Sequence, residues 1–334
     1  MRKKWLWIIP VLLIAVYMLG PKPLTPVYKT DMPVVPSDAA QLESYVKNNE
    51  AQHKLKPDNE ARIIWANDSS KQKTDYAIVY LHGFTASQAE GDPIHKNIAK
   101  EFGCNLYLSR LAEHGIDTSD AMQNLTADNY WESAKQALAI GKQLGKKVIL
   151  MTTSTGGTNA LQLAAAYPDA DIAALILMSP NIEINDPNAW LLNNHWGLQI
   201  AHLVLKSDYI TSTDERPIYR QYWDWKYRAE AATALEEMLE TTMKKETFEK
   251  VKVPVQLLYF YKDETHQDST VKVSAMLKMY DELGTPESLK RKQAMPNAGT
   301  HVIGSYIKSH DVGGVQKEIE KFMEEVLKMK AINK

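Results

Sequence analysis

Short, continuously apolar runs alternate with longer amphipathic segments along most of the chain. The runs predicted as strands are Arg62–Trp65, Tyr76–Leu81, Asn105–Leu108, Lys147–Thr152, Ile172–Met178, Val255–Tyr261 and Lys290–Met295. The segments predicted as helices are residues 38–54, a helix ending over 97–102, and residues 129–144, 158–167, 229–249, 271–283 and 315–329. Strands buried on both faces are continuously apolar, and their alternation with helices is typical of βαβ units. The pattern therefore predicts an α/β fold with a mostly parallel, doubly wound sheet.

One long segment interrupts this alternation. More than seventy residues separate the predicted strand ending at Met178 from the one starting at Val255. Because structureless loops of that length are uncommon in compact domains, we expect a helical cap insertion over about residues 183–250. Its aromatic residues include Trp190, Trp196, Tyr209, Tyr219, Tyr222, Trp223, Trp225 and Tyr227. They either pack the insertion itself or form an apolar wall over a substrate pocket.

The N-terminus has the charge pattern of a membrane-targeting segment. Three basic residues, Arg2–Lys4, precede an apolar run from Trp5 to Gly20 that contains no charged residue. The run ends in bulky residues where a cleavage site requires small ones, which favours an uncleaved signal anchor, a transmembrane helix, over residues 1–20. The run is slightly shorter than the ~20 residues of a usual span. The remainder is then expected to be periplasmic or at the cell surface, or secreted if the segment is cleaved.

Composition adds little to this division of the chain. Five prolines between residues 21 and 36 predict an extended spacer over 21–37, which leaves residues 38–334 for the folded domain. Hydrophobic residues make up 44% of the chain and the net charge is −2, so nothing favours nucleic-acid binding. The single cysteine, Cys104, lies in an apolar run and is expected to be a buried thiol. No sequence feature defines an oligomeric state.

The candidate nucleophile is Ser154. It follows the predicted strand Lys147–Thr152 and precedes Gly156 and Gly157, so it stands at a turn between a strand and a helix. Such a turn exposes the serine hydroxyl above the sheet and directs the N–H groups of the helix N-terminus at a developing oxyanion. The usual pattern is G-x-S-x-G, and Thr152 replaces its first glycine. By itself the motif is equally consistent with an ordinary helix N-cap.

A second element supports the catalytic interpretation. The strand Tyr76–Leu81 runs directly into His82-Gly83-Phe84. An H-G loop after an early strand supplies the other oxyanion donor in serine hydrolases with this turn. The backbone N–H groups of Phe84 and Thr155 are therefore the expected oxyanion hole, and His82 is expected to be structural.

An acid and then a base must follow the serine along the chain. Asp268, just before the helix predicted over 271–283, is the preferred acid; Asp263 is the second choice, with turn stabilisation as its more ordinary role, and Glu264 the third. His301 follows the last predicted strand and is the expected base. His310 and His266 are less well placed, and the other six histidines precede the acid.

These motifs resemble the α/β-hydrolase superfamily, and most closely its branch of carboxylesterases, monoacylglycerol lipases and serine aminopeptidase-like hydrolases. The matching sequences are HGFTAS at 82–87, TSTGG at 153–157, QDSTV at 267–271 and GTHVI at 299–303. The similarity spans about residues 60–330. It departs from the family pattern at Thr152 and at Glu113, in a stretch where the family often has a Gly-His-Gly loop.

The expected activity is hydrolysis of a small carboxylic ester through a Ser154-Asp268-His301 triad and an acyl-enzyme, with no metal or organic cofactor. One alternative is an aminopeptidase-like enzyme, which needs acidic groups to hold an amine. The candidates in the insertion are Glu183, Asp186, Asp214, Glu215 and Asp224. The other alternative is a non-catalytic, membrane-tethered binding domain on the same fold, which the substitution at Thr152 keeps open.

Overall fold

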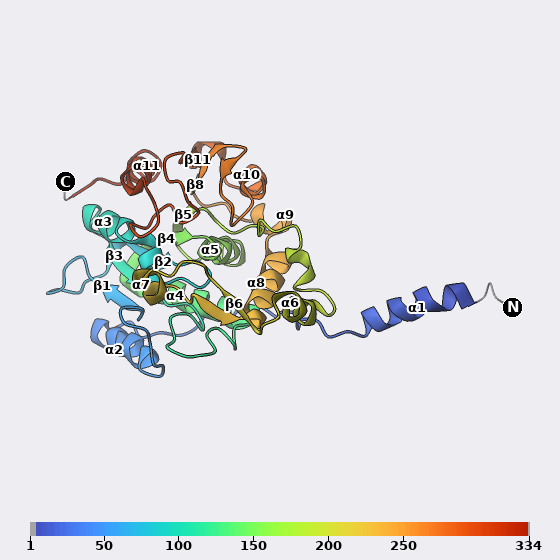
Figure 1. Cartoon of the computed structure of the whole chain (residues 1–334). Coiled ribbons are helices and arrows are strands. Elements are labelled where there is room, and N and C mark those ends of the chain that lie inside the picture. Colours follow the sequence, from blue (N-terminus) through green and yellow to red (C-terminus); the bar gives the residue numbers. More distant parts are fainter. Residues whose placement is uncertain (1–4, 333–334) are drawn as a thin grey trace.

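The computed structural model describes residues 5–332, and its centre is a seven-stranded sheet (Figure 1). The strands are β1 (Arg62–Ile64), β2 (Thr74–Leu81), β3 (Asn105–Leu108), β4 (Gly145–Thr153), β5 (Ile172–Met178), β8 (Val255–Tyr259) and β11 (Lys290–Ala294). Their order in the sheet is β1-β3-β2-β4-β5-β8-β11. Only the pairing of β1 with β3 is antiparallel. The predicted α/β class and mostly parallel sheet are therefore confirmed.

Helices cover both faces of this sheet. They include α2 (Ala39–Glu50), α3 (Ile94–Glu101), α4 (Ala127–Leu144), α5 (Thr155–Ala166), α10 (Val273–Glu282) and α11 (Val312–Glu325). Within β2, Ile78 and Tyr80 pack in the core shared with α3 and α11, whereas Val79 and Leu81 pack in the core shared with α4, α5 and α10. Successive side chains of a strand face opposite ways, so a strand buried on both faces is continuously apolar. This explains why the sequence pattern identified the central strands to within two residues of their ends.

The segment between β5 and β8 folds over the carboxyl ends of the strands. It contains η2 (Ala189–Leu191), α6 (Gly197–Leu205), β6 (Tyr209–Thr211), α7 (Pro217–Tyr222), β7 (Lys226–Arg228), α8 (Ala229–Thr242) and α9 (Lys245–Phe248). The antiparallel pair of β6 and β7 was not predicted from the sequence. The helix predicted over 229–249 is divided between α8 and α9. The boundaries proposed for the insertion and for the other segments of the chain stay predictions.

The strand predicted over 255–261 ends earlier than expected. After β8 the chain forms β9 (Tyr261–Asp263), which pairs antiparallel with β10 (His266–Gln267). This short hairpin lies between the sheet and Asp268. The apolar pattern continued through Tyr261, so the sequence did not show where the parallel sheet stopped.

The N-terminal apolar run forms α1 (Trp5–Met18), which extends away from the folded body (Figure 1). Its 14 residues correspond to a helix of roughly 21 Å, compared with about 30 Å for the hydrocarbon core of a bilayer. Across residues 5–332, none of the helices has both the length and the apolar character needed to cross a membrane. The predicted transmembrane anchor is therefore not supported by the described residues, and Arg2–Lys4 lie outside them.

The proline-rich stretch after α1 is extended and lies along α4. The carboxylate of Asp128 accepts hydrogen bonds of 2.9 Å from the backbone N–H groups of Val27 and Tyr28. The indole of Trp131 donates to the carbonyl of Lys29, and the buried Lys135 donates to the carbonyl of Asp31. Residues 27–31 are thus attached to the domain by contacts that composition alone could not reveal.

We predict that Gly156→Ala lowers the free energy of unfolding by about 1–3 kcal/mol, measured by urea denaturation. A Cβ atom at Gly156 would lie 2.0 Å from the carbonyl oxygen of Leu81, so α5 or β2 would have to move. Gly313→Ala in α11 is the matched control, because among the described residues no neighbouring heavy atom lies within 4 Å of a Cβ built there. We expect the control to be neutral or slightly stabilising; equal losses in both variants would contradict the close-approach argument.

Candidate active site

Ser154 occupies a sharp turn between β4 and α5. Its backbone has φ 52° and ψ −121°, a conformation that residues other than glycine rarely adopt. Its N–H donates a hydrogen bond of 3.0 Å to the carbonyl of Met178. Its own carbonyl accepts hydrogen bonds from the N–H groups of Gly157 and Asn181. Non-glycine residues keep such a strained conformation only where the surrounding structure enforces it, and these residues cluster at functional sites. The geometry is that of a nucleophile elbow.

The unusual Thr152 fits this elbow. Its side chain is fully buried, and its hydroxyl donates to the carbonyl of Ile176 on β5 at 3.2 Å. The close approach that the elbow requires comes instead from Gly156, which faces the carbonyl oxygen of Leu81. The threonine therefore replaces the family glycine without leaving a buried hydroxyl unpaired.

The two predicted oxyanion donors flank Ser154. Phe84 lies in the loop that follows β2, and Thr155 is the first residue of α5. Within residues 5–332, neither backbone N–H has a hydrogen-bond acceptor. Buried N–H groups are usually paired, so the unpaired N–H of the buried Thr155, with that of the partly buried Phe84, fits the predicted role of binding a negatively charged oxygen.

Asp268 and His301 form a buried pair beside the elbow. His301 Nδ1 and Asp268 Oδ2 are 2.6 Å apart, and Asp268 Oδ1 accepts hydrogen bonds from the N–H groups of Thr270 and Val271. The described residues contain no hydrogen bond between Ser154 and His301, but both side chains line the same cavity. Catalytic hydrogen bonds are often long without substrate and shorten when it binds.

The electrostatics of this pair suit a base and its orienting acid. Burial disfavours the charged form of each group. The charge of His301, its hydrogen bond and the two backbone N–H groups outweigh burial at Asp268 and lower the pKa of its carboxyl. At His301 the attraction and hydrogen bond of Asp268 outweigh burial and raise the imidazole pKa above its ordinary value. The lowered pKa favours the ionised form of Asp268, and the raised pKa favours the charged form of His301.

The rival acid and bases lie elsewhere. Asp263 is half exposed and caps its own turn, accepting hydrogen bonds from the N–H groups of Thr265 and His266. Its partner His266 is exposed on the same hairpin. His310 packs near Gly299, and His82 is buried and structural: its ring accepts a hydrogen bond from the N–H of Leu111.

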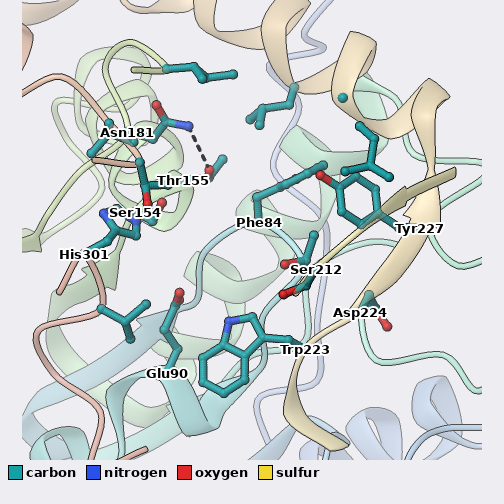
Figure 2. A pocket seen from close by; sticks show the side chains of 18 of the residues that line it. Phe84, Glu90, Ser154, Thr155, Asn181, Ser212, Trp223, Asp224, Tyr227 and His301 are labelled. Carbon is teal, nitrogen blue, oxygen red and sulfur yellow. Dashed lines mark hydrogen bonds between the residues drawn. The ribbon is translucent and has the colours of Figure 1, made fainter. Parts of the chain in front are cut away.

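A cavity of about 520 Å³ opens above Ser154 (Figure 2). Of the aromatic residues singled out in the insertion, Tyr219, Trp223 and Tyr227 line it, whereas the others do not. The ring of Tyr227 packs edge-on against Phe84, with centroids 5.3 Å apart. The insertion thus supplies an apolar wall over the elbow, and the size is ordinary for a small-molecule site.

Among the polar residues of this cavity that sequence reasoning missed, Asn181 and Glu90 lie close to the elbow (Figure 2). The amide of Asn181 donates to the hydroxyl of Thr155 at 3.4 Å, and Glu90 is a buried carboxylate on a short 3₁₀ helix after β2. Neither belongs to a recognisable motif. Only the packing of their segments against the elbow reveals them. No cluster of metal-ligating side chains exists among residues 5–332.

This arrangement, a serine elbow on a mostly parallel sheet with an oxyanion loop and a buried Asp-His pair, defines an α/β-hydrolase. The sequence pattern of the family described as "Serine aminopeptidase, S33" matches residues 72–292, so the chain belongs to this family. No curated protein matches the chain in sequence.

Solved structures share the fold at low sequence identity. A structure from work on LipS and LipT, two metagenome-derived lipolytic enzymes, matches at 16% identity and TM-score 0.64, covering 81% of this chain and 99% of the other. The Paleococcus ferrophilus monoacylglycerol lipase matches at 13% identity and TM-score 0.58, covering 79% of this chain and 98% of the other. Est1E from Butyrivibrio proteoclasticus matches at 17% identity and TM-score 0.55, covering 80% of this chain and 94% of the other. At these identities the similarity establishes the fold alone.

We predict that Asp268→Asn slows the labelling of Ser154 by a fluorophosphonate probe by about 10³–10⁴-fold, because the asparagine no longer stabilises charged His301. The measurement is the pseudo-first-order labelling rate at pH 8. Asp263→Asn, which changes an exposed turn, is the control and should label at the wild-type rate. A larger loss in the Asp263 variant would show that the acid was wrongly assigned.

Proposed function

We propose that this protein hydrolyses carboxylic esters by acyl transfer to Ser154. The observation that supports this most directly is the pair of unpaired N–H groups, of Phe84 and Thr155, on either side of a strained, cavity-lining serine. Attack of a serine on an ester carbonyl carbon produces an oxyanion, so preformed donors beside a nucleophilic serine support acyl chemistry.

In the proposed mechanism His301 takes the proton of the Ser154 hydroxyl as its oxygen bonds to the ester carbonyl carbon. The carbonyl oxygen becomes the oxyanion held by Phe84 and Thr155. The imidazolium of His301, oriented by Asp268, returns its proton to the leaving alcohol as the carbon–oxygen bond breaks. Water then attacks the acyl-enzyme by the same route, releasing the acid and restoring Ser154.

The acidic candidates of the insertion favour esters over substrates with a free amine. Four of the five acidic candidates in the insertion are paired with cations: Asp224 with Lys56 at 2.8 Å, Asp214 with Arg216 and Lys308, Glu183 with Lys272, and Glu215 with Arg220. Asp186 lines the cavity from an exposed position. A carboxylate already neutralised by lysine or arginine is a poor site for a second cation.

An aminopeptidase-like activity is the second candidate, supported by the name of the matching family and by Asp186 at the edge of the cavity. It is distinguished from the first by comparing hydrolysis of aryl esters with hydrolysis of aminoacyl arylamides. A binding domain on the same fold would hydrolyse neither and would not react with a fluorophosphonate.

We predict that Ser154→Ala abolishes hydrolysis of short-chain aryl esters, with a loss of at least about 10⁴-fold in kcat, since no other side chain replaces the nucleophile. The assay is release of the phenol, and the wild-type protein should also be labelled by a fluorophosphonate. Thr155→Ala is the matched control, because its oxyanion donor is a backbone group that the change retains. Turnover by the Ser154 variant at the wild-type rate would disprove the assignment.

We also propose, from the sequence, that the domain lies outside the cytoplasm and that its N-terminal segment holds it at a membrane. The support is the basic start followed by an uncharged run, whose apolar side chains from Ile8 to Leu19 are exposed in the folded protein.

The expected outcome in a bacterial host is that protease added to spheroplasts degrades the full-length domain. A chain lacking residues 1–20 should remain in the cytoplasm and be protected, because it lacks the export signal. Protection of the full-length chain would contradict the proposed location. Retention in the membrane fraction after a salt wash would distinguish an anchored chain from a released one.

A further inference from the structure

Glu90 is a buried carboxylate that the triad does not use. It lies in η1 (Gln88–Gly91), is only 3% exposed, and its Oε2 accepts a hydrogen bond from the N–H of Gly83 at 2.5 Å. Gly83 immediately precedes Phe84, the expected oxyanion donor. The carboxylate therefore holds the His82–Gly83 peptide, which directly precedes the peptide that carries the Phe84 N–H.

Glu90 is also close to the nucleophile. A Cβ atom built at Gly83 would lie 2.8 Å from the Cβ of Ser154 and 2.9 Å from both carboxylate oxygens of Glu90. The carboxylate and the serine therefore approach the same point on the backbone of Gly83. Glu90 and His301 line the same cavity, and the carboxylate is directed toward Ser154 and His301 (Figure 2).

The charge of Glu90 acts on His301. Burial raises the pKa of Glu90 to about 7, although the hydrogen bond from Gly83 and the charge of His301 oppose this shift. In return Glu90 adds to Asp268 in raising the pKa of His301. The other titratable groups facing Glu90 are the phenols of Tyr80 on β2, Tyr130 on α4 and Tyr219 on α7, whose pKa values burial raises.

Those phenols stay neutral near pH 7, so His301 is the group whose charge responds to Glu90. Asp268 holds Nδ1 of the imidazole, and Glu90 contributes a second negative charge from the cavity side. During acyl transfer the imidazole becomes positively charged and then neutral again. A carboxylate that stabilises the charged form lowers the barrier to serine attack.

We propose that Glu90 is a positioning residue of the active site, which fixes the His82–Gly83 peptide, next to the peptide that carries the Phe84 N–H, and stabilises the charged form of His301. The proposal rests on the acyl transfer described above. Glu90 itself forms no bond to the substrate. Its effect is on the proton that moves from Ser154 to His301 and then to the leaving alcohol.

The test is the pH dependence of ester hydrolysis by Glu90→Gln from pH 5 to pH 10. Glutamine retains an oxygen that accepts the Gly83 hydrogen bond, so the change removes the charge and keeps the contact. His301 must be neutral to act as a base, and activity is lost as pH falls through its pKa. Because the variant lowers that pKa, the acid limb of kcat/KM should move to lower pH by about half a unit or more. Above pH 8, kcat should fall at least about threefold, with KM little changed.

Glu236→Gln is the matched control. Glu236 on α8 is another buried carboxyl whose pKa burial raises to about 7, but it does not line the catalytic cavity. Its variant should reproduce the wild-type pH profile. A pH profile of Glu90→Gln that coincides with that of wild type would overturn the proposal. Faster turnover at every pH would overturn it too, because it would mean that the carboxylate destabilises the oxyanion.

A second measurement separates this proposal from the proposed function. The pKa of the His301 imidazole is read by NMR titration in Ser154→Ala, with and without Glu90→Gln, and should be lower in the double variant. This readout requires no turnover. If wild type hydrolyses no ester while the His301 pKa still falls, the substrate assignment fails and the effect of Glu90 stands. An unchanged His301 pKa overturns the proposal whatever the activity.

Discussion

The left-handed backbone at Ser154 is the constraint on which the rest of the site depends. It brings the chain from β4 into α5 without an intervening loop, and it is maintained by hydrogen bonds from both sides of the serine to neighbouring segments. The turn closes only because Gly156 lets α5 approach the carbonyl of Leu81 at the end of β2. Phe84, in the loop after the same strand, and Thr155, at the start of α5, line one cavity with Ser154. The proposed oxyanion hole would therefore follow from how one helix meets one strand.

The surroundings of two buried carboxyl groups near this turn shift their pKa values in opposite directions. Asp268 receives two backbone N–H groups and the imidazole of His301, and its pKa is lowered despite burial. Glu90 receives one backbone N–H group, and burial raises its pKa to about 7. At Asp268 the charge of His301, together with hydrogen bonds to the charged form, outweighs burial, whereas at Glu90 burial prevails. The difference gives the site one permanent negative charge and one that depends on pH.

The insertion gives the cavity its character. Its aromatic residues Tyr219, Trp223 and Tyr227 cover the elbow, while lysine and arginine neutralise most of its acidic residues. The family match is consistent with a hydrolase, although the chain's own residues carry the argument.

The sequence by itself determined the central strands, the covering helices and the order in which Ser154, Asp268 and His301 follow one another. Strands buried on both faces must be apolar, and strand ends are where an α/β sheet carries its chemistry, so local pattern and chain order were sufficient. The sequence did not reveal Glu90 or Asn181, the β6–β7 pair, or the attachment of residues 27–31 to α4. Each of these depends on contacts between segments far apart in the chain. Only the tertiary structure decided them, because a buried polar group owes its role to the partner that folding brings to it.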